Sequence, residues 1–252
     1  MKRAALAIFL SLFAAANPFA EEIDGAAFFK TARESMKFSR DGAQINIKRA
    51  SVVPAKGLCV SVPDGEMLSI AFSNKTSMLA VGPAEFKIEA FIQGSAENSP
   101  DDNLDRESAP SNISLSLKNG RFLFSLGKRL GSSKFTVKFP NAESEIQSGI
   151  AIAETGTNGS RLIPLDGFAR IKPQDSIWEI VKDGVSAVVP AKESDKKIIF
   201  KHVYSRERER FGNFIKTAEQ LRRSVIFKYS PNAGFAAELI LPKAFFAMPI
   251  KH

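Results

Sequence analysis

Short runs of β-prone residues, separated by turn residues, repeat along most of this chain. Runs such as 58–62 and 67–72 end at Pro, Gly, Asn or Asp, and the same rhythm continues to about residue 190. Proline fixes φ and glycine accepts positive φ, so Pro63-Asp64-Gly65 is a turn with a clear physical cause. Many short strands about 8–12 residues apart are typical of sandwiches and barrels. The sequence therefore predicts a mainly β fold, a jelly-roll or β-roll-like sandwich of short strands, over residues 43–190.

Two glycine-containing pairs inside this region are predicted to end strands. Gly82-Pro83 follows the apolar run 78–81, and Asn119-Gly120 follows the alternating run 113–117. Glycine and proline are the strongest sequence signals for the end of a strand. The polar stretch 93–111 shows no apolar periodicity, which predicts an exposed loop.

The segment before the β region is predicted to contain a short helix. Over 25–37, Phe29, Ala32 or Arg33, and Met36 are spaced as on one face of a helix. Residues 21–42 are therefore interpreted as a helical lead-in that packs one face on the sheets.

The segment after the β region, residues 196–252, is predicted to form a helix followed by a β-hairpin. Apolar residues between Phe211 and Leu221 recur at helical spacing, which indicates one buried stripe. Residues 224–229 and 235–241 are predicted to be paired strands. This segment either docks on the sandwich or stands as a small module.

The first twenty residues have the layout of a secretory signal peptide. Lys2 and Arg3 precede the apolar run 4–16, and small residues follow it. That run is shorter than the roughly 20 residues that span a bilayer as a helix. We predict cleavage after Ala16 or Ala20, and an uncleaved anchor is the alternative. The mature protein is expected to be periplasmic or secreted, without a transmembrane segment.

The positive charge of the chain is concentrated near its end. The whole sequence carries a net charge of +8, and the segment 196–252 holds 12 Lys and Arg against 4 Asp and Glu, also a net of +8. Residues 21–195 are close to neutral. This asymmetry predicts two parts with different roles.

Arginines of the C-terminal segment form a candidate surface for an anion or a partner: Arg206, Arg208, Arg210, Arg222 and Arg223. Side chains at neighbouring helix positions point apart, so the alternating Arg and Glu of 206–210 cannot all pair along the helix. The surface is either a solvated basic face or a site for phosphate-rich envelope lipid or an acidic protein. Nucleic acid is discounted because the protein is expected to be exported.

The order of motifs in the β region resembles the periplasmic sensor-type domain of the FecR family, which is named for iron-dicitrate signalling. The matching pieces lie at 64–72 with 80–83, at 117–124, at 135–142 and at 165–171. They include the turns Asp64-Gly65, Gly82-Pro83 and Asp166-Gly167, and they cover about half of the chain. The resemblance implies an exported, non-catalytic β domain that binds another macromolecule.

The residue counts exclude several kinds of site. One Cys rules out an intramolecular disulfide framework and a Cys-built zinc site, and two His leave little for metal or triad chemistry. No nucleophile elbow or phosphate-binding loop is present. Cys59 is interpreted as a small buried strand residue rather than a reactive thiol, and His202 as a bystander at a strand end.

Two further groups are candidate ligand sites. Asp101, Asp102, Asp105 and Glu107 could offer oxygen ligands to Ca²⁺, but they lack the spacing of an EF-hand and favour an exposed solubilising loop. Trp178 is interpreted as core material, with a sugar-stacking platform as the alternative.

The function that these observations predict is an exported, non-enzymatic FecR-like domain without cofactor or metal. It would bind a protein or cell-envelope component, with an anionic lipid surface as one candidate partner, in envelope signalling or assembly. The alternative is an exported enzyme that cleaves glycan with a carboxylate pair, such as Asp64 with Glu66 or Asp166 with Glu179; such a pair must lie about 5–10 Å apart. A structural envelope scaffold is a third possibility.

Overall fold

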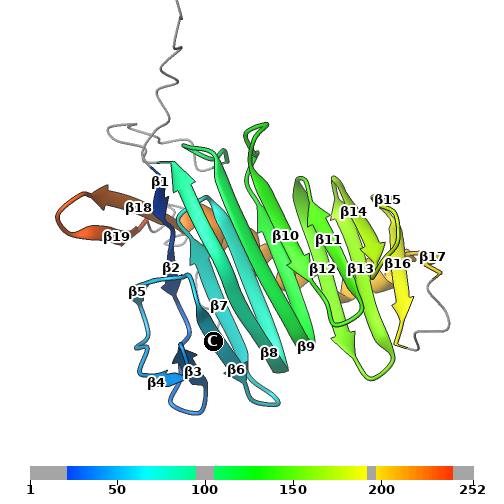
Figure 1. The fold of residues 1–252 in the computed structure, drawn as a ribbon, viewed down its shortest axis with the longest axis horizontal. Coiled ribbons are helices and arrows are strands. Elements are labelled where there is room, and N and C mark those ends of the chain that lie inside the picture. The colour runs from blue at the N-terminus through cyan, green and yellow to red at the C-terminus, as the bar shows by residue number, and fades with distance from the viewer. Residues whose placement is uncertain (1–21, 95–104, 192–196, 241–252) are drawn as a thin grey trace, which may run out of the picture.

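The computed structural model describes residues 22–94, 105–191 and 197–240. The protein is mainly β, with two packed layers of strands and the helices α1 (Ser205–Arg210) and α2 (Gly212–Ser224) behind one of them (Figure 1). The predicted fold class, including the C-terminal helix and hairpin, is confirmed. The predicted signal peptide lies outside the described residues. Neither α1 nor α2 is long and apolar enough to cross a bilayer.

The first layer is the one that the helices cover. In order across the sheet it contains β5 (Ser51–Pro54), β2 (Ala26–Phe29), β7 (Met67–Phe72), the first part of β8 (Thr76–Gly94), the second part of β9 (Ser111–Leu126), β12 (Gly149–Gly156), β13 (Gly159–Asp166), β16 (Val185–Pro190) and β17 (Ile199–His202). These pairings are all antiparallel.

The second layer faces the first across the main core. In order it contains β4 (Ala43–Ile45), β3 (Lys37–Arg40), β6 (Leu58–Val62), the remainder of β8, the beginning of β9, β10 (Lys134–Lys138), β11 (Ala142–Ile146), β14 (Phe168–Pro173) and β15 (Glu179–Lys182). Here β9 and β10 run parallel. The short strand β1 (Glu22–Asp24) pairs with the end of β8.

The strands β8 and β9 belong to both layers because each bends in its middle. A Cβ atom at Gly82 would lie 1.7 Å from the carbonyl oxygen of Pro63, and one at Gly120 would lie 2.5 Å from Cβ of Ala84. Only glycine allows such a close approach. The prediction that Gly82-Pro83 and Asn119-Gly120 end strands is therefore wrong: the β8–β9 pairing resumes beyond an irregularity in register, and the glycines act as bends.

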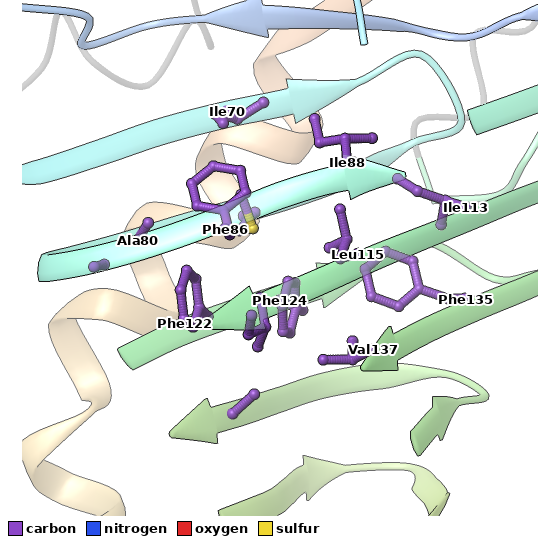
Figure 2. Close-up of a cluster of buried hydrophobic side chains, with 14 of the residues drawn as sticks. Ile70, Ala80, Phe86, Ile88, Ile113, Leu115, Phe122, Phe124, Phe135 and Val137 are labelled. Atoms are coloured by element: carbon purple, nitrogen blue, oxygen red, sulfur yellow. The ribbon is translucent and has the colours of Figure 1, made fainter. Parts of the chain in front are cut away.

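The main core lies between the two layers. Aromatic rings join the layers at the bend: Phe86 meets Phe122 at a centroid separation of 5.7 Å, and Phe124 meets Phe135 at 5.2 Å. Figure 2 shows these rings among the aliphatic side chains of β7, β8, β9 and β10. Inward side chains alternate with outward ones along β6, β10 and β11, as expected for strands with one buried face.

The predicted helical lead-in is wrong. Its first apolar residues form the strand β2, which lies between β5 and β7. Phe28 of β2 packs on the helix side of the first layer, whereas Phe29 packs in the main core. A strand with both faces covered is a continuous apolar run, and such a run cannot be told from a helix by periodicity alone.

The C-terminal segment docks on the first layer. Leu221 and Ala218 of α2 are fully buried against residues of the sheet such as Leu79 and Ile152. The Ser77 hydroxyl also donates a hydrogen bond of 2.7 Å to the Ala218 carbonyl. The hairpin of β18 (Val225–Ser230) and β19 (Gly234–Leu239) follows, and it projects at the end of the molecule opposite β15 and β17 (Figure 1).

Candidate functional site

Exposed apolar side chains gather at the end of the sandwich formed by β14 to β17. Ile177, Ile180 and Tyr204 have 77%, 66% and 72% of their surface exposed. Together with three half-exposed residues on strands of the same end, they are called the apolar end patch: Phe168, Ile177, Ile180, Ile199, Phe200 and Tyr204. Isolated apolar residues on a surface are ordinary, but several at one place indicate an interaction site.

The apolar end patch spans both layers. Phe168 on β14 lies opposite Lys182, and Ile180 on β15 lies opposite Arg170, so Phe168 and Ile180 are diagonal neighbours on the outer face of the second layer. Ile199 and Phe200 belong to β17, at the edge of the first layer. Figure 1 shows β15 and β17 at the same end of the molecule.

Both strands at this end present a free edge. Within the described residues β15 is paired with β14 and β17 with β16, and no strand covers their other sides. An unpaired edge exposes backbone N–H and C=O groups that can accept another strand. All four residues of β17 are exposed.

Trp178 marks the outer side of this end. Its ring lies 4.7 Å from the Arg170 guanidinium and 4.7 Å from the Lys172 ammonium. The interpretation of Trp178 as core material is therefore wrong, since the ring is only half-buried and contacts two cations. The cations are in turn paired with Glu145 and Glu143.

The five predicted arginines do not form one surface. Arg222 is buried: its Nε donates to the Ser125 hydroxyl at 3.3 Å and its Nη2 to Asp105 at 2.9 Å. The prediction that Arg222 belongs to an exposed anion surface is therefore wrong, because α2 packs this side chain against the sheet. Arg223 also binds Asp105, at 3.0 Å, and Arg208 binds Asp183 and the Leu165 carbonyl.

Two of the predicted arginines stay exposed on α1. Arg206 and Arg210 lie one helical turn apart, on the side of the helix away from the sheet. Between them, Glu207 binds Arg161 of β13 at 2.6 Å. The Arg161 guanidinium keeps the pKa of the Glu207 carboxyl below its usual range. An anion site on this segment stays a prediction that involves Arg206 and Arg210.

The acidic residues near 101–107 neutralise arginines in the structure. Asp101 and Asp102 lie outside the described residues. Hydrogen bonding from Arg222 lowers the pKa of the Asp105 carboxyl. Glu107 is buried and accepts hydrogen bonds from Ser111 Oγ at 2.7 Å and from the Leu130 N–H at 3.1 Å. The prediction that residues 93–111 form an exposed loop is therefore wrong at Glu107.

Each of four cavities on the described surface is lined by one carboxylate. Glu34 lines the largest, of about 840 Å³, and Glu85 lines the cavity of about 790 Å³ at the bend of β8 and β9. Glu85 and Glu154 line two smaller cavities. A glycoside hydrolase needs two carboxylates across one bond.

The carboxylates named for a glycan hydrolase lie elsewhere. Asp64 and Glu66 belong to the turn between β6 and β7, and Glu66 accepts a hydrogen bond from Ser35 at 2.6 Å. Asp166 ends β13 in the first layer, whereas Glu179 begins β15 in the second. Among the described residues, no three His, Cys, Asp or Glu side chains converge as metal ligands would.

Cys59 and His202, which the sequence offered as a buried thiol and a bystander, both have exposed surface. Cys59 lies in β6 as predicted, but it is only half-buried and faces outward, beside Lys87 of β8. His202 is exposed at the end of β17, with its ring 5.7 Å from the ring of Tyr204. The apolar end patch was not predicted from the sequence, although the apolar run Ile198-Ile199-Phe200 lies between Lys197 and Lys201.

Comparisons with known proteins add little to this geometry. No protein-family model matches the chain, and no curated protein sequence matches it. Two crystal structures of a proposed anti-sigma factor from Parabacteroides distasonis overlay on it with TM-scores of 0.44 and 0.42 and sequence identities of 12% and 11%. The overlays cover 61% and 60% of this chain and 63% and 62% of those chains. A TM-score below 0.5 does not establish a common fold.

Proposed function

We propose that this protein is an exported, non-catalytic binding module whose protein partner docks on the apolar end patch. The observation that carries the proposal is the concentration of exposed apolar side chains at one end of the sandwich. Burying such side chains in an interface is favourable by about 25 cal/mol per Å² of apolar surface removed from water.

The free edges of β15 and β17 favour a partner that binds through a segment in extended conformation. A segment of a partner protein can add to a sheet edge by backbone hydrogen bonds, while its side chains contact the apolar residues beside the edge. Ile199 and Phe200 on β17 point to opposite faces of the sheet, so an added strand would find one apolar neighbour on each face.

Lysines around the patch favour acidic groups at the rim of the partner's surface. Lys182 lies opposite Phe168, and Lys201 follows Phe200 on the exposed strand β17. Complementary charges at a rim accelerate association and reject wrong partners more than they add affinity. The FecR-like motifs and the signal-peptide layout support a role in envelope signalling or assembly.

The test is capture from envelope extracts of the exporting cell with the full-length mature protein as bait. Wild type is compared with the variants Ile177→Asp/Ile180→Asp and Ile199→Asp/Phe200→Asp. The matched control is Leu239→Asp/Ile240→Asp, which places two carboxylates on exposed apolar residues at the opposite end. We expect one envelope protein to be captured by wild type and by the control, and to be reduced at least tenfold by either patch variant.

Three results would overturn the proposal. They are equal capture by the patch variants, capture of no protein by wild type, and binding of wild type to anionic vesicles in the absence of any captured protein. The last result would assign the apolar end patch to a lipid surface instead.

A further inference from the structure

A cavity lies beside β3 and β4. Figure 1 shows β3, β4 and β5 at the end of the sandwich opposite β15 and β17. Two connections cross between the layers there. Residues 30–36 lead from β2 in the first layer to β3 in the second, and residues 46–50 lead from β4 back to β5. We call the cavity of about 840 Å³ that both connections line the crossover groove.

The floor of the crossover groove is apolar because it reaches the main core. Met36, Phe38 and Ile47 belong to the core cluster, and Ile45 packs against that cluster while remaining partly exposed. The volume of the crossover groove lies within the range of roughly 300–1,000 Å³ that is typical of ligand sites in proteins. Met36 and Ile47 each keep 5% of their surface exposed, and the partly exposed Ile45 adds to the apolar surface of the floor.

The rim of the crossover groove is cationic. Arg33 stands on one crossing connection, and Lys48 and Arg49 stand on the other. All three side chains are exposed, and within the described residues none of them takes part in an ion pair. Glu34 is the one carboxylate of the lining, so the groove carries a net positive charge.

The turn that bears Lys48 and Arg49 is held in place. Ser51 Oγ donates to the Lys48 carbonyl at 2.6 Å, and the Ala50 N–H donates to the Phe29 carbonyl at 2.7 Å. Ala50 has φ of 58°, in the left-handed region that a residue with a Cβ rarely adopts. A rim that is ordered before binding loses less entropy when a ligand arrives.

We propose that the crossover groove binds an amphiphile made of one hydrocarbon chain and one anionic head group, of the chemical class of a fatty-acid carboxylate. The chain lies along the floor formed by Met36, Ile45 and Ile47. The head group accepts charge-assisted hydrogen bonds from Arg33, Lys48 and Arg49. This site is distinct from the apolar end patch and does not depend on the function proposed for that patch.

The experiment measures palmitate binding to the full-length mature protein by titration calorimetry below the micelle concentration. Hexadecanol has the same chain without the charge, and we expect it to bind at least tenfold more weakly. The variant Arg33→Gln/Lys48→Gln/Arg49→Gln should weaken palmitate binding at least tenfold and leave hexadecanol binding unchanged. Ile45→Asp should abolish binding of both, with unchanged circular dichroism as the check on folding.

A matched control removes the same number of charges elsewhere. Lys37→Gln/Lys87→Gln/Lys134→Gln neutralises three exposed lysines on the outer face of the second layer, and it should bind palmitate as wild type does. Raising the ionic strength from about 0.01 M to about 1 M shortens the Debye length from about 30 Å to about 3 Å, so palmitate binding by wild type should weaken.

Several outcomes would overturn the inference. They are no saturable palmitate binding by wild type, equal affinity for hexadecanol, and unchanged affinity in the triple rim variant. Binding of a peptide of alternating Glu and Leu without any binding of palmitate would assign the crossover groove to an acidic segment instead. The patch variants should bind palmitate normally, which separates this test from that of the proposed function.

Discussion

Arg222 on α2 donates a hydrogen bond from Nη2 to Oδ1 of Asp105, 2.9 Å away, although the two residues are 117 positions apart in the sequence. The guanidinium is buried on the sheet, whereas the carboxylate is largely exposed. Arg223 reaches the same oxygen from the exposed side at 3.0 Å. One carboxylate in the segment before β9 therefore anchors the end of the C-terminal helix through two neighbouring arginines.

These two arginines should differ sharply in their contribution to stability. Arg222→Ala removes the donor of Ser125 and Asp105 together with a buried aliphatic stem, so we expect the free energy of unfolding to fall by about 2–4 kcal/mol. Arg223→Ala breaks an exposed pair and should cost about 0–1 kcal/mol. Urea unfolding measures both, and equal losses would contradict the assigned burial.

The buried pair of Glu107 and Arg129 gives a second prediction. The two charges lie 3.6 Å apart, with 1% and 6% of their side chains exposed, and among the described residues Arg129 Nε and Nη1 have no hydrogen-bond partner. Burial lowers the pKa of the Arg129 guanidinium. Glu107→Ala leaves that charge buried without its acceptor and should cost about 3–5 kcal/mol.

Replacing both partners should restore most of that loss. We expect Glu107→Gln/Arg129→Met to lie within about 1–2 kcal/mol of wild type, because no uncompensated charge stays buried. A double-mutant cycle that adds the single variants Glu107→Gln and Arg129→Met measures the coupling directly. A double variant as unstable as Glu107→Ala would show that the hydrogen bonds of Glu107, not the charge of Arg129, dominate.

The pair of Glu207 and Arg161 should make stability depend on acid pH. The hydrogen bond from Arg161 lowers the folded-state pKa of Glu207, so the folded state binds this proton less readily than the unfolded state. The stabilisation is then complete above the unfolded pKa of about 4.3 and is lost as the pH falls through the folded value. Wild type and Glu207→Gln should differ in unfolding free energy at pH 7, and this difference should shrink progressively as the pH falls below the unfolded pKa of about 4.3.

The control for this pH series is Glu209→Gln, on the exposed side of the same helix. It should change the unfolding free energy by less than about 0.5 kcal/mol throughout. A Glu207→Gln variant that differs from wild type equally at pH 7 and pH 3 would refute the role of the ionised pair.

Docking of α2 on the first layer can be tested through Leu221. This side chain is fully buried, and Leu221→Ala should lower the free energy of unfolding of the whole protein by about 2–5 kcal/mol. Gln220→Ala, at the exposed neighbouring position, should have little effect. Two separate unfolding transitions, with only one shifted by Leu221→Ala, would show that the C-terminal segment is an independent module.

Export remains a prediction from the sequence, and mass spectrometry of the intact protein tests it. Protein recovered from the exporting cell should begin at Asn17 or Glu21, as expected for cleavage after Ala16 or Ala20. A product that retains Lys2 and Arg3 and fractionates with membranes would favour the uncleaved anchor.

Much of the fold could be predicted because strands and turns depend on patterns of a few neighbouring residues. The alternation in β6 and β10 and the turn residues after them identified strands without knowledge of their neighbours. The same local reasoning failed at Gly82 and Gly120, where a glycine that can end a strand instead bends one. It also failed at Ala26–Phe29, where a short apolar run is ambiguous between helix and strand.

The candidate sites were less predictable. Charge counting correctly found a basic C-terminal segment, but burial of Arg222 and pairing of Arg208 and Arg223 depend on Asp105 and Asp183, which lie far away in the sequence. The apolar end patch was missed for the same reason. From the sequence alone, an apolar residue in a strand is expected to be in the core. Only the neighbouring strands in the structure show that it lies at an exposed edge.

The sequence by itself therefore determined that the chain forms short strands, an amphipathic helix and a hairpin, because side-chain periodicity and turn chemistry act over a few residues. Only the tertiary structure decided that β8 and β9 join two layers, and that α2 covers one of them. It also decided which apolar and charged side chains stay exposed, at the apolar end patch and around the crossover groove. Burial is a property of contacts between distant segments, and no local pattern encodes those contacts.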